Sequence, residues 1–443
     1  MSPSAISASL GPRGRGLVCG AVLVVYGVFI VAPACRHPNT NGFAAYYTAS
    51  RILLQTPRDL KRAYDDLWFQ ERIDASGFAH VRDVYFQPPT MSLMLVPFAW
   101  LSPARARIAW IICSVLLWWA GLALLVKTLA RPGGGLVAPW LHLAALTTLY
   151  VPLADNLRQG QGYSLLFFLL CSVLYLARQP NPRRTWLAGV PLGFMLVLKM
   201  AGVWFWPFLL AARRWGVLTA GAVTALGVAI FAAPVVDGEA WKRFCQELPR
   251  LASDPVRYVT GYQTVTSLTG HLFVFNSRWS STPVANHPRL SIGLGLVVTG
   301  AALIVSARLQ RLASEDRDAS ALSWGMLTAL CVSLTPIAES YHYLLVLPAV
   351  VIALWWATQQ GVSRISWALL LFAIVLLITP YQIYDSRHLQ VGWLALLAYP
   401  RLYGAFVLWG WLARALTIRS TANPSRIEDA AMPRVIESRS TTV

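Results

Sequence analysis

The 443-residue chain has few charged residues, few cysteines and none of the short motifs that mark several common enzyme classes. Charged residues make up only 13% of it. The six cysteines form no CxxC pair and have no metal-ligand spacing with histidine, so we expect no structural metal site. A glycine-rich phosphate loop, an HExxH helix and a GxSxG elbow are also missing. These absences exclude P-loop nucleotide hydrolysis, zinc-peptidase chemistry and an α/β-hydrolase site.

Apolar residues dominate the chain instead. They make up 56% of it, with 19 tryptophans, and the mean hydropathy is +0.53. An apolar run of roughly 20 residues crosses a hydrocarbon core about 30 Å thick as a helix. We therefore predict an all-α polytopic membrane protein with about 11–13 transmembrane helices. The candidate spans are 17–34, 85–102, 106–127, 136–152, 163–177, 185–200, 202–212, 216–236, 290–307, 319–338, 341–358, 365–380 and 391–413.

We attribute the formal net charge of +18 to membrane topology, and we expect no nucleic acid partner. Much of the excess arginine lies in short connections between spans and in the tail, and we place that side in the cytoplasm. The large loops 35–84 and 237–289 are then outside, and only Cys35 and Cys245 are placed where they can meet outside the membrane. The arginine pattern requires one segment between 85 and 152 that does not span fully.

Three regions follow from this topology. We predict a short cytoplasmic arm at 1–16, one transmembrane domain at 17–416 and a disordered cytoplasmic tail at 417–443. The apolar run 17–34 lacks a clear small-residue cleavage pattern, so we interpret it as an uncleaved first span and not as a signal peptide.

The first outer loop has the composition of surface helices. Between Asn41 and Pro89, apolar and aromatic residues recur at helical spacing in a segment too polar for lipid, which predicts two short amphipathic helices at the bilayer surface. Its acids, Asp83 included, alternate with basic residues, so we expect exposed ion pairs from most of them. Aromatic and guanidinium groups at an interface hold sugars and phosphates. The candidate binding residues here are Tyr46, Tyr47, Arg51 and Tyr85.

The second large outer loop also contains a helical pattern. Apolar residues from Trp241 to Leu248 share one face until Pro249, which predicts another interfacial helix. The polar stretch after it supplies Gln263 and His271 as further candidate binding residues.

Lys199 is an ionisable residue at the end of an apolar run, with no cluster of acids near it in the sequence. Such groups are costly in a membrane, and they are either paired structural groups or parts of a functional path. One interpretation is a cation that holds an anionic group such as phosphate. The other is a lysine that snorkels from a helix end to the interface.

Two more polar groups lie between spans. Asp155, Asn156 and Gln161 belong to PLADNLRQGQGY, and such a loop at the lip of a cavity suits hydroxyl-rich ligands, although an ordinary polar turn is the alternative. Glu339 and His342 belong to TPIAESYHYLL. A carboxylate and an imidazole this close to lipid suit a base or a proton relay.

The order of short motifs along the chain resembles one family. FAAYYTASRILL is followed by YFQPP, LVPFAWLS, GQG, a lone Lys199 after GFMLVL, TSLTG and TPIAESYHYLLVLP. This order is similar to that of integral-membrane glycosyltransferases with the GT-C fold. Within them it looks most like glycosyltransferase family 87, the bacterial polyprenyl-phosphate-mannose-dependent mannosyltransferases. The resemblance covers roughly residues 17 to 400.

The resemblance implies an outward-facing cavity at which the first outer loop, the GQG turn, Lys199 and the Glu339 loop meet. A lipid-linked sugar would enter from the bilayer and an acceptor from the aqueous side. A base removes the proton of the acceptor hydroxyl, and polyprenyl phosphate departs. No nucleotide or protein cofactor is implied, although outer-loop carboxylates leave recruitment of a divalent metal open.

The chain departs from the family pattern at the expected base. The family commonly has an acidic residue immediately before the aromatic residue of the first loop, and this chain has Asn41 and Gly42 before Phe43. Neither residue takes a proton at neutral pH. Tyr163 also stands where an asparagine is sometimes expected after GQ.

Three explanations of the missing acid are open. The base has moved, to Glu339 with His342 or to Asp155; or Asp65 or Asp66 serves; or the protein binds a lipid-linked sugar without transferring it. We expect the first, which makes Glu339, His342 and Asp155 the predicted catalytic residues. The predicted substrate-binding residues are Tyr46, Tyr47, Arg51, Tyr85, Asn156, Gln161, Lys199, Gln263 and His271.

The sequence therefore predicts a glycosyltransferase that moves a sugar, which we expect to be mannose, from a polyprenyl-phosphate donor to a glycan or glycolipid. The reaction is expected on the outer side of a bacterial cytoplasmic membrane, with membrane lipid, donor and acceptor as partners. The alternative is a non-enzymatic transporter or flippase, or an inactive relative that binds sugar lipids. Inverted repeats would favour a transporter, and the sequence shows no such symmetry.

Overall fold

The computed structural model describes residues 20–21, 23–37, 40–130, 150–179, 182–312 and 317–421. These residues are predominantly helical and contain no β-strand, as an all-α protein requires. Among the described residues, four helical stretches are long and apolar enough to cross a membrane: Pro103–Leu129, Trp215–Ala232, Pro288–Arg311 and Ser340–Gln360. Five shorter apolar helical stretches accompany them. The predicted span 136–152 and the start of the span 17–34 lie largely outside the described residues, and so does the arm 1–16.

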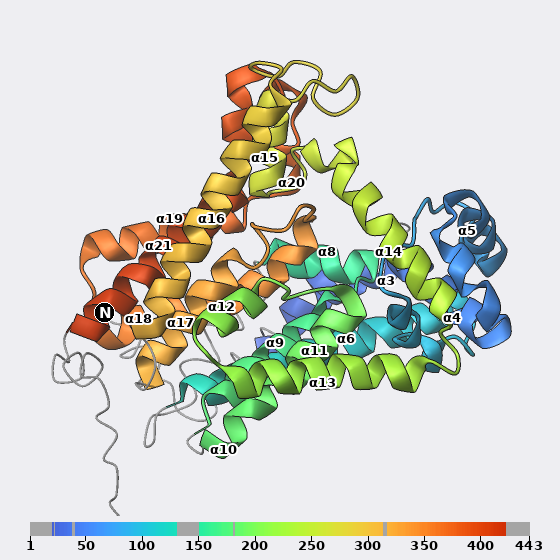
Figure 1. The fold of residues 1–443 in the computed structure, drawn as a ribbon, viewed down its shortest axis with the longest axis horizontal. Coiled ribbons are helices and arrows are strands. Elements are labelled where there is room, and N and C mark those ends of the chain that lie inside the picture. Colours follow the sequence, from blue (N-terminus) through green and yellow to red (C-terminus); the bar gives the residue numbers. More distant parts are fainter. Residues whose placement is uncertain are drawn as a thin grey trace, which may run out of the picture.

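A first group of helices packs side by side across the centre of the molecule (Figure 1). Glycines allow two of them, α11 and α13, to approach closely. A Cβ on Gly193 of α11 would lie 2.4 Å from the Gly221 oxygen of α13, so only glycine fits there. The helices of this group are α6 (Pro103–Leu129), α9 (Tyr163–Ala177), α10 (Pro182–Thr185), η6 (Trp186–Ala188), α11 (Gly189–Lys199), α12 (Phe205–Ala211) and α13 (Trp215–Ala232).

A second group of helices lies to the left in Figure 1. Its centre is α21 (Pro400–Thr421), which packs against α17 and α19 and continues past residue 417, where we expected the disordered tail to begin. Residues 422–443 of that tail are not described. The other members of this group are α16 (Pro288–Leu312), α17 (Arg317–Leu330), η8 (Ser340–Val346), α18 (Leu347–Gln360) and α19 (Arg364–Leu377).

The segment 85–102 does not form the transmembrane helix that its composition predicts. It contains two short 3₁₀ helices, η4 (Pro89–Leu93) and η5 (Val96–Phe98), because Pro88, Pro89 and Pro97 interrupt any longer helix. The hydroxyl of Thr90 donates to the oxygen of Val197, which ties this segment to α11. The segment 85–102 therefore contains no helix long enough to cross a membrane.

The predicted first outer loop folds into a compact lobe, seen at the right in Figure 1 and called the outer lobe below. Its first helix, α4, was predicted to lie at the bilayer surface, but most of its residues are buried in an aromatic core, because small residues such as Ala44, Ala45 and Ala49 let other segments pack on every side of it. The lobe consists of α4 (Phe43–Gln55), η2 (Pro57–Tyr64), α5 (Asp66–Ile73) and η3 (Asp74–Phe78), with α14 (Gly238–Ser253) packed against it.

Pro249 does not end α14, which runs on to Ser253. Ala240 and Phe244 of this helix are buried against the outer lobe, so the predicted apolar face is present, whereas Cys245 is exposed. Cys35 and Cys245 are both free thiols, and the pairing that their predicted placement allowed does not occur.

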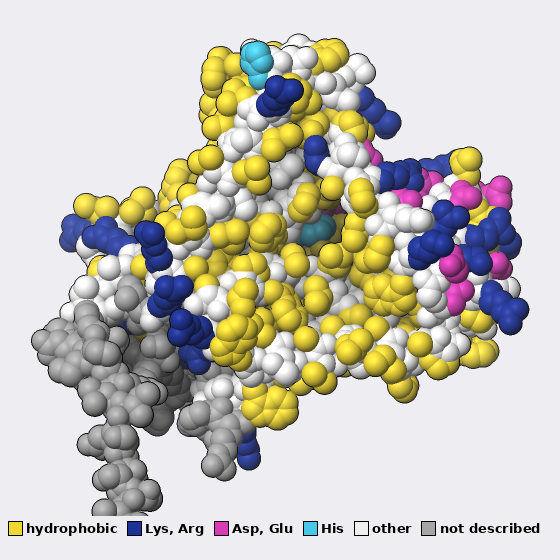
Figure 2. Space-filling model, viewed as in Figure 1, with side chains coloured by type: hydrophobic (Ala, Val, Ile, Leu, Met, Phe, Trp, Pro, Cys, Tyr) yellow, Lys and Arg dark blue, Asp and Glu magenta, His cyan; other side chains and the backbone are white. Residues whose placement is uncertain are grey.

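An upper lobe lies at the top of the molecule in Figure 1. Figure 2 shows a hollow between the upper and outer lobes, with a histidine side chain in its depth. The upper lobe contains η7 (Pro255–Tyr258), α15 (Val265–Phe273), α20 (Tyr381–Tyr384), η9 (Arg387–Leu389) and η10 (Gly392–Ala398). Below it, α8 (Val151–Gln159) packs against η8 and against the amino-terminal helices η1 (Gly27–Val31) and α3 (Ala32–Arg36).

Candidate active site

Lys199 lies at a junction of three elements. It is the last residue of α11, because Met200 adopts a left-handed conformation that ends the helix. Its ammonium group donates hydrogen bonds to the Tyr46 hydroxyl of α4 and, at 3.1 Å, to Gln161 Oε1. It also lies 4.9 Å from the centroid of the Tyr46 ring and 4.7 Å from that of Tyr163, and no carboxylate of the described residues is within ion-pair distance. The hydrogen-bond partners of the ammonium group are therefore neutral, and no carboxylate of the described residues contacts it.

Gln161 occupies the space that a side chain at Gly42 would need. The Gln161 oxygen accepts a hydrogen bond of 2.5 Å from the Tyr46 hydroxyl, in addition to the one from Lys199. Gly42 precedes α4 with φ of 87°, and a Cβ there would lie 2.2 Å from Gln161 Nε2. In this chain the space that a side chain at Gly42 would need is therefore filled by an amide.

Glu339 and His342 form a reciprocal cap at the start of η8. The Glu339 N–H donates to His342 Nδ1 at 3.0 Å, and the Glu339 carboxylate accepts from the backbone N–H of His342. The imidazole packs against the Tyr163 ring at 4.4 Å between centroids, which brings this turn next to Lys199. Burial raises the pKa of Glu339 above its ordinary value.

This cap changes the role that we predicted for His342. Since Nδ1 accepts the Glu339 N–H, a neutral imidazole carries its proton on Nε2 and acts there as a donor. A general base needs a free lone pair, and the Nδ1 lone pair of His342 already accepts the backbone N–H of Glu339. The geometry favours a hydrogen-bond donor to an anionic group in place of the predicted base.

Asp83 is a residue of this site that the sequence analysis assigned to exposed ion pairs. Its carboxylate accepts hydrogen bonds from the backbone N–H of Gly42 and, at 2.9 Å, from that of Val84. Burial raises the pKa of Asp83 to about 6, although these N–H groups and Lys199 lower it in part. The available signal was position, because Asp83 directly precedes the apolar stretch VYFQPP whereas the other acids of the loop lie in mixed-charge helices.

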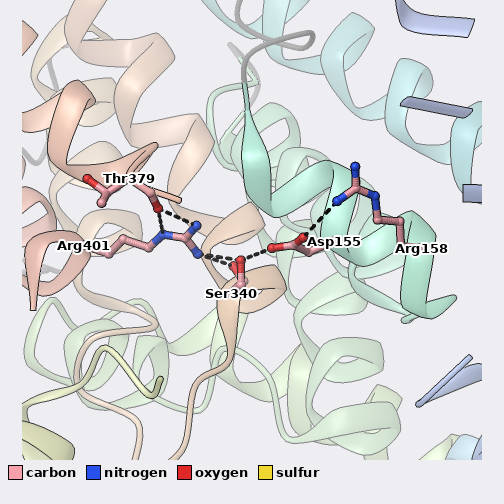
Figure 3. Close-up of polar contacts among 5 residues, drawn as sticks. All are labelled: Asp155, Arg158, Ser340, Thr379 and Arg401. Atoms are coloured by element: carbon pink, nitrogen blue, oxygen red, sulfur yellow. Dashed lines mark hydrogen bonds and ion pairs between the residues drawn. The ribbon is translucent and has the colours of Figure 1, made fainter. Parts of the chain in front are cut away.

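Asp155, the third predicted catalytic residue, is part of a structural chain of polar groups (Figure 3). Its carboxylate accepts from the Ser340 hydroxyl and lies 4.0 Å from Arg158. Ser340 in turn accepts from the fully buried Arg401 at 2.6 Å, and Arg401 also donates to the oxygen of Thr379 at 2.9 Å. This series of hydrogen-bonded groups joins α8, η8 and α21, and it gives Asp155 a positioning role.

Replacing Arg401 with methionine should lower the free energy of unfolding by about 3 kcal/mol, because Ser340 and the Thr379 carbonyl would lose buried hydrogen bonds. The thermal unfolding midpoint in detergent measures this loss. The control is Arg250→Met, which removes an exposed ion pair to Asp66 and should cost at most about 1 kcal/mol. Equal midpoints for the two variants would contradict the structural role of Arg401.

Three predicted binding residues have their polar atoms engaged within the protein. Asn156 is buried and closes the turn between α8 and α9 through Ser164 Oγ at 3.0 Å and the N–H of Tyr163 at 3.0 Å. Gln263 donates to two backbone oxygens, each at 2.8 Å, and His271 contacts the oxygens of Tyr258 and Gln390. These contacts give all three a structural role, in place of the predicted binding role.

Two more predicted binding residues belong to the core of the outer lobe. The Tyr47 hydroxyl donates to Leu101 O at 2.7 Å, and the Tyr85 hydroxyl donates to Pro88 O at 3.2 Å, with both rings buried. Arg51 is partly buried with its guanidinium carbon 6.0 Å from the Tyr47 ring centroid. Of the predicted binding set, the structure therefore brings together Tyr46, Gln161 and Lys199.

The described residues contain no group of three or more His, Cys, Asp or Glu side chains that could hold a metal ion. The family model of glycosyltransferase family 87 matches residues 85–334, which is more than half of the chain and includes Gln161 and Lys199. No curated protein and no solved structure gave a significant match. On the extent of the family match, the chain belongs to glycosyltransferase family 87 and is a membrane glycosyltransferase.

Proposed function

We propose that the protein transfers mannose from a polyprenyl-phosphate donor to a glycan or glycolipid on the outer face of a bacterial cytoplasmic membrane. The observation that carries this proposal is the ammonium group of Lys199, which lies among neutral partners at the end of an apolar helix. A cation with no carboxylate of the described residues at ion-pair distance can bind a phosphate with charge-assisted hydrogen bonds.

The surroundings of Lys199 favour a phosphate that is attached to a lipid. Helix α11 packs against α13, which exposes most of its apolar side chains, including Phe231 with 86% of its surface exposed and Val223 with 64%. Such a surface suits contact with acyl or prenyl chains. A phosphate held by Lys199 would therefore sit beside a surface on which its prenyl tail can lie.

The reaction follows from the groups around this phosphate. The acceptor oxygen attacks the anomeric carbon, the new glycosidic bond forms, and the bond from that carbon to the phosphate oxygen breaks with its electron pair on the phosphate. Lys199 and the Nε2–H of His342 stabilise the charge that develops there. The proton of the acceptor passes to a carboxylate, for which Asp83 and Glu339 are the two candidates in the site.

The proposal is tested by incubating purified protein in lipid nanodiscs with radiolabelled polyprenyl-phosphate mannose and a panel of glycan and glycolipid acceptors. We expect labelled acceptor and an equal amount of free polyprenyl phosphate, and no product from a nucleotide sugar. Reconstitution in vesicles distinguishes the alternative. Movement of intact donor between leaflets without product would refute transfer and favour a flippase.

A further inference from the structure

Two carboxylates border the site, and they belong to different segments of the fold. Asp83 belongs to the segment between η3 and η4, whose neighbours Val84 and Phe86 are 44% and 37% exposed. Glu339 directly precedes the apolar stretch Ser340–Gln360, of which 78% is buried inside the protein. Asp83 therefore lies beside exposed residues, whereas Glu339 leads into a buried segment.

The backbone holds Asp83 in a defined position at the beginning of α4. The Asp83 carboxylate accepts the N–H of Gly42, the residue that precedes the helix, and an anion is favoured at such an end. Gln70 of α5 supports the same segment, because its amide donates to Val81 O at 2.9 Å and its oxygen accepts the Asp83 N–H at 3.4 Å. The Asp83 carboxylate is thus held by the N–H of Gly42, and the backbone of its segment is held by α5.

The groups that face Asp83 come from three other parts of the chain. Lys199 of α11 interacts favourably with its charge, and the hydroxyl of Tyr46 and the carboxylate of Glu339 are within electrostatic range. Since Lys199 also contacts Tyr46 and Gln161, a phosphate held by Lys199 would place the adjoining anomeric carbon near Asp83.

We infer that Asp83 is the general base of the transfer. Gly42 provides no acid at the expected position, and the segment about forty residues further along the chain brings the Asp83 carboxylate to it. This inference rests on the proposed function above. In the step, the proton of the acceptor hydroxyl moves to an Asp83 oxygen as the acceptor oxygen bonds to the anomeric carbon and polyprenyl phosphate leaves with the electron pair. The protonated Asp83 then returns its proton to water.

The raised pKa of Asp83 gives the reaction a pH dependence with a defined sign. A base acts in its deprotonated form, and the pKa of Asp83 is raised to about 6. The value of kcat/KM should therefore fall as the pH drops through about 6. Glu339 also has a raised pKa, so the profile must be compared between variants of both residues.

The experiment measures transfer, donor binding and the pH profile for Asp83→Asn, Asp83→Glu and Glu339→Gln in nanodiscs, with polyprenyl-phosphate mannose as the probe. Asp83→Asn keeps an oxygen that can accept the Gly42 N–H but removes the base. We expect transfer to fall by about 100-fold or more with donor affinity within threefold of wild type. Asp83→Glu should recover part of the activity. The control is Glu71→Gln, which changes an exposed acid of α5 in the same lobe and should leave transfer unchanged.

The pH profiles separate the two carboxylates. Glu339→Gln should keep the fall in rate below about pH 6, and the residual activity of Asp83→Asn should lack it. Wild-type transfer by Asp83→Asn, or a loss of donor binding that accounts for its whole defect, would overturn the inference. So would a Glu339→Gln profile without the acid limb. If wild-type protein forms no product from the donor, the proposed function itself fails, and the inference falls with it.

Discussion

Replacing Lys199 with methionine should lower kcat/KM for the lipid-linked donor by about 100-fold or more. The variant keeps the apolar part of the side chain but loses the positive charge that, in our proposal, binds the phosphate. Loss of one such donor costs about 3–4 kcal/mol of transition-state stabilisation. The Tyr46 hydroxyl and Gln161 would also lose their common partner. Initial rates of transfer at several donor concentrations measure the effect.

Lys127→Met is the matched control for this variant. Lys127 is also in the last turn of an apolar helix, α6, but its side chain is exposed, as expected for a lysine that snorkels. Its replacement should change kcat/KM by less than twofold. If Lys199→Met behaves like Lys127→Met, then Lys199 is only a helix-end lysine, and the phosphate site that we propose is wrong.

Replacing Gly42 with alanine should reduce transfer by about 100-fold, because the new Cβ would lie 2.2 Å from Gln161 Nε2 and the amide would have to move. Gln161 would then lose its contacts with Tyr46 and Lys199. The N–H of Gly42 also holds Asp83, so a shift of this backbone moves the proposed base as well. Transfer rates and the thermal unfolding midpoint should be measured together.

Gly361→Ala is the control that separates the clash with Gln161 from the conformational cost of a positive φ. Gly361 ends α18 with φ of 59°, and a Cβ there would meet nothing within 4 Å. Its replacement carries only the conformational cost of a left-handed residue, about 1–2 kcal/mol. We expect a lower unfolding midpoint with full transfer activity. A Gly42→Ala protein that loses stability to a similar extent but keeps its activity would show that the fit between Gly42 and Gln161 is not needed for catalysis.

The parts of the site that the sequence predicted are those marked by a polar residue at the end of an apolar segment. Lys199 and Glu339 are of this kind, and a charge at such a place has few structural reasons to be there. Asp83 also directly precedes an apolar segment, but the mixed charges of the loop before it predict an exposed ion pair. Its hydrogen bond to Gly42 spans 41 residues, and only the folded outer lobe brings the two together.

The limits of the fold prediction have similar physical causes. The helical class followed from apolar runs, but their composition did not show that 85–102 is broken by prolines into η4 and η5. The apolar residues of helix α4 have the spacing of a surface helix, but the helix is buried because other segments pack against its alanines. Asn156 and Gln263 are polar residues in outer segments, and their backbone partners, which sequence does not reveal, give them structural roles.

The most direct test of the phosphate site is a structure of the protein in nanodiscs with polyprenyl-phosphate mannose bound. We predict a phosphate oxygen about 3 Å from Lys199 Nζ, with the sugar between Asp83 and Glu339 and the prenyl chain on the apolar surface beside α13. A donor whose phosphate binds elsewhere, with Lys199 still bonded only to Tyr46 and Gln161, would contradict the account.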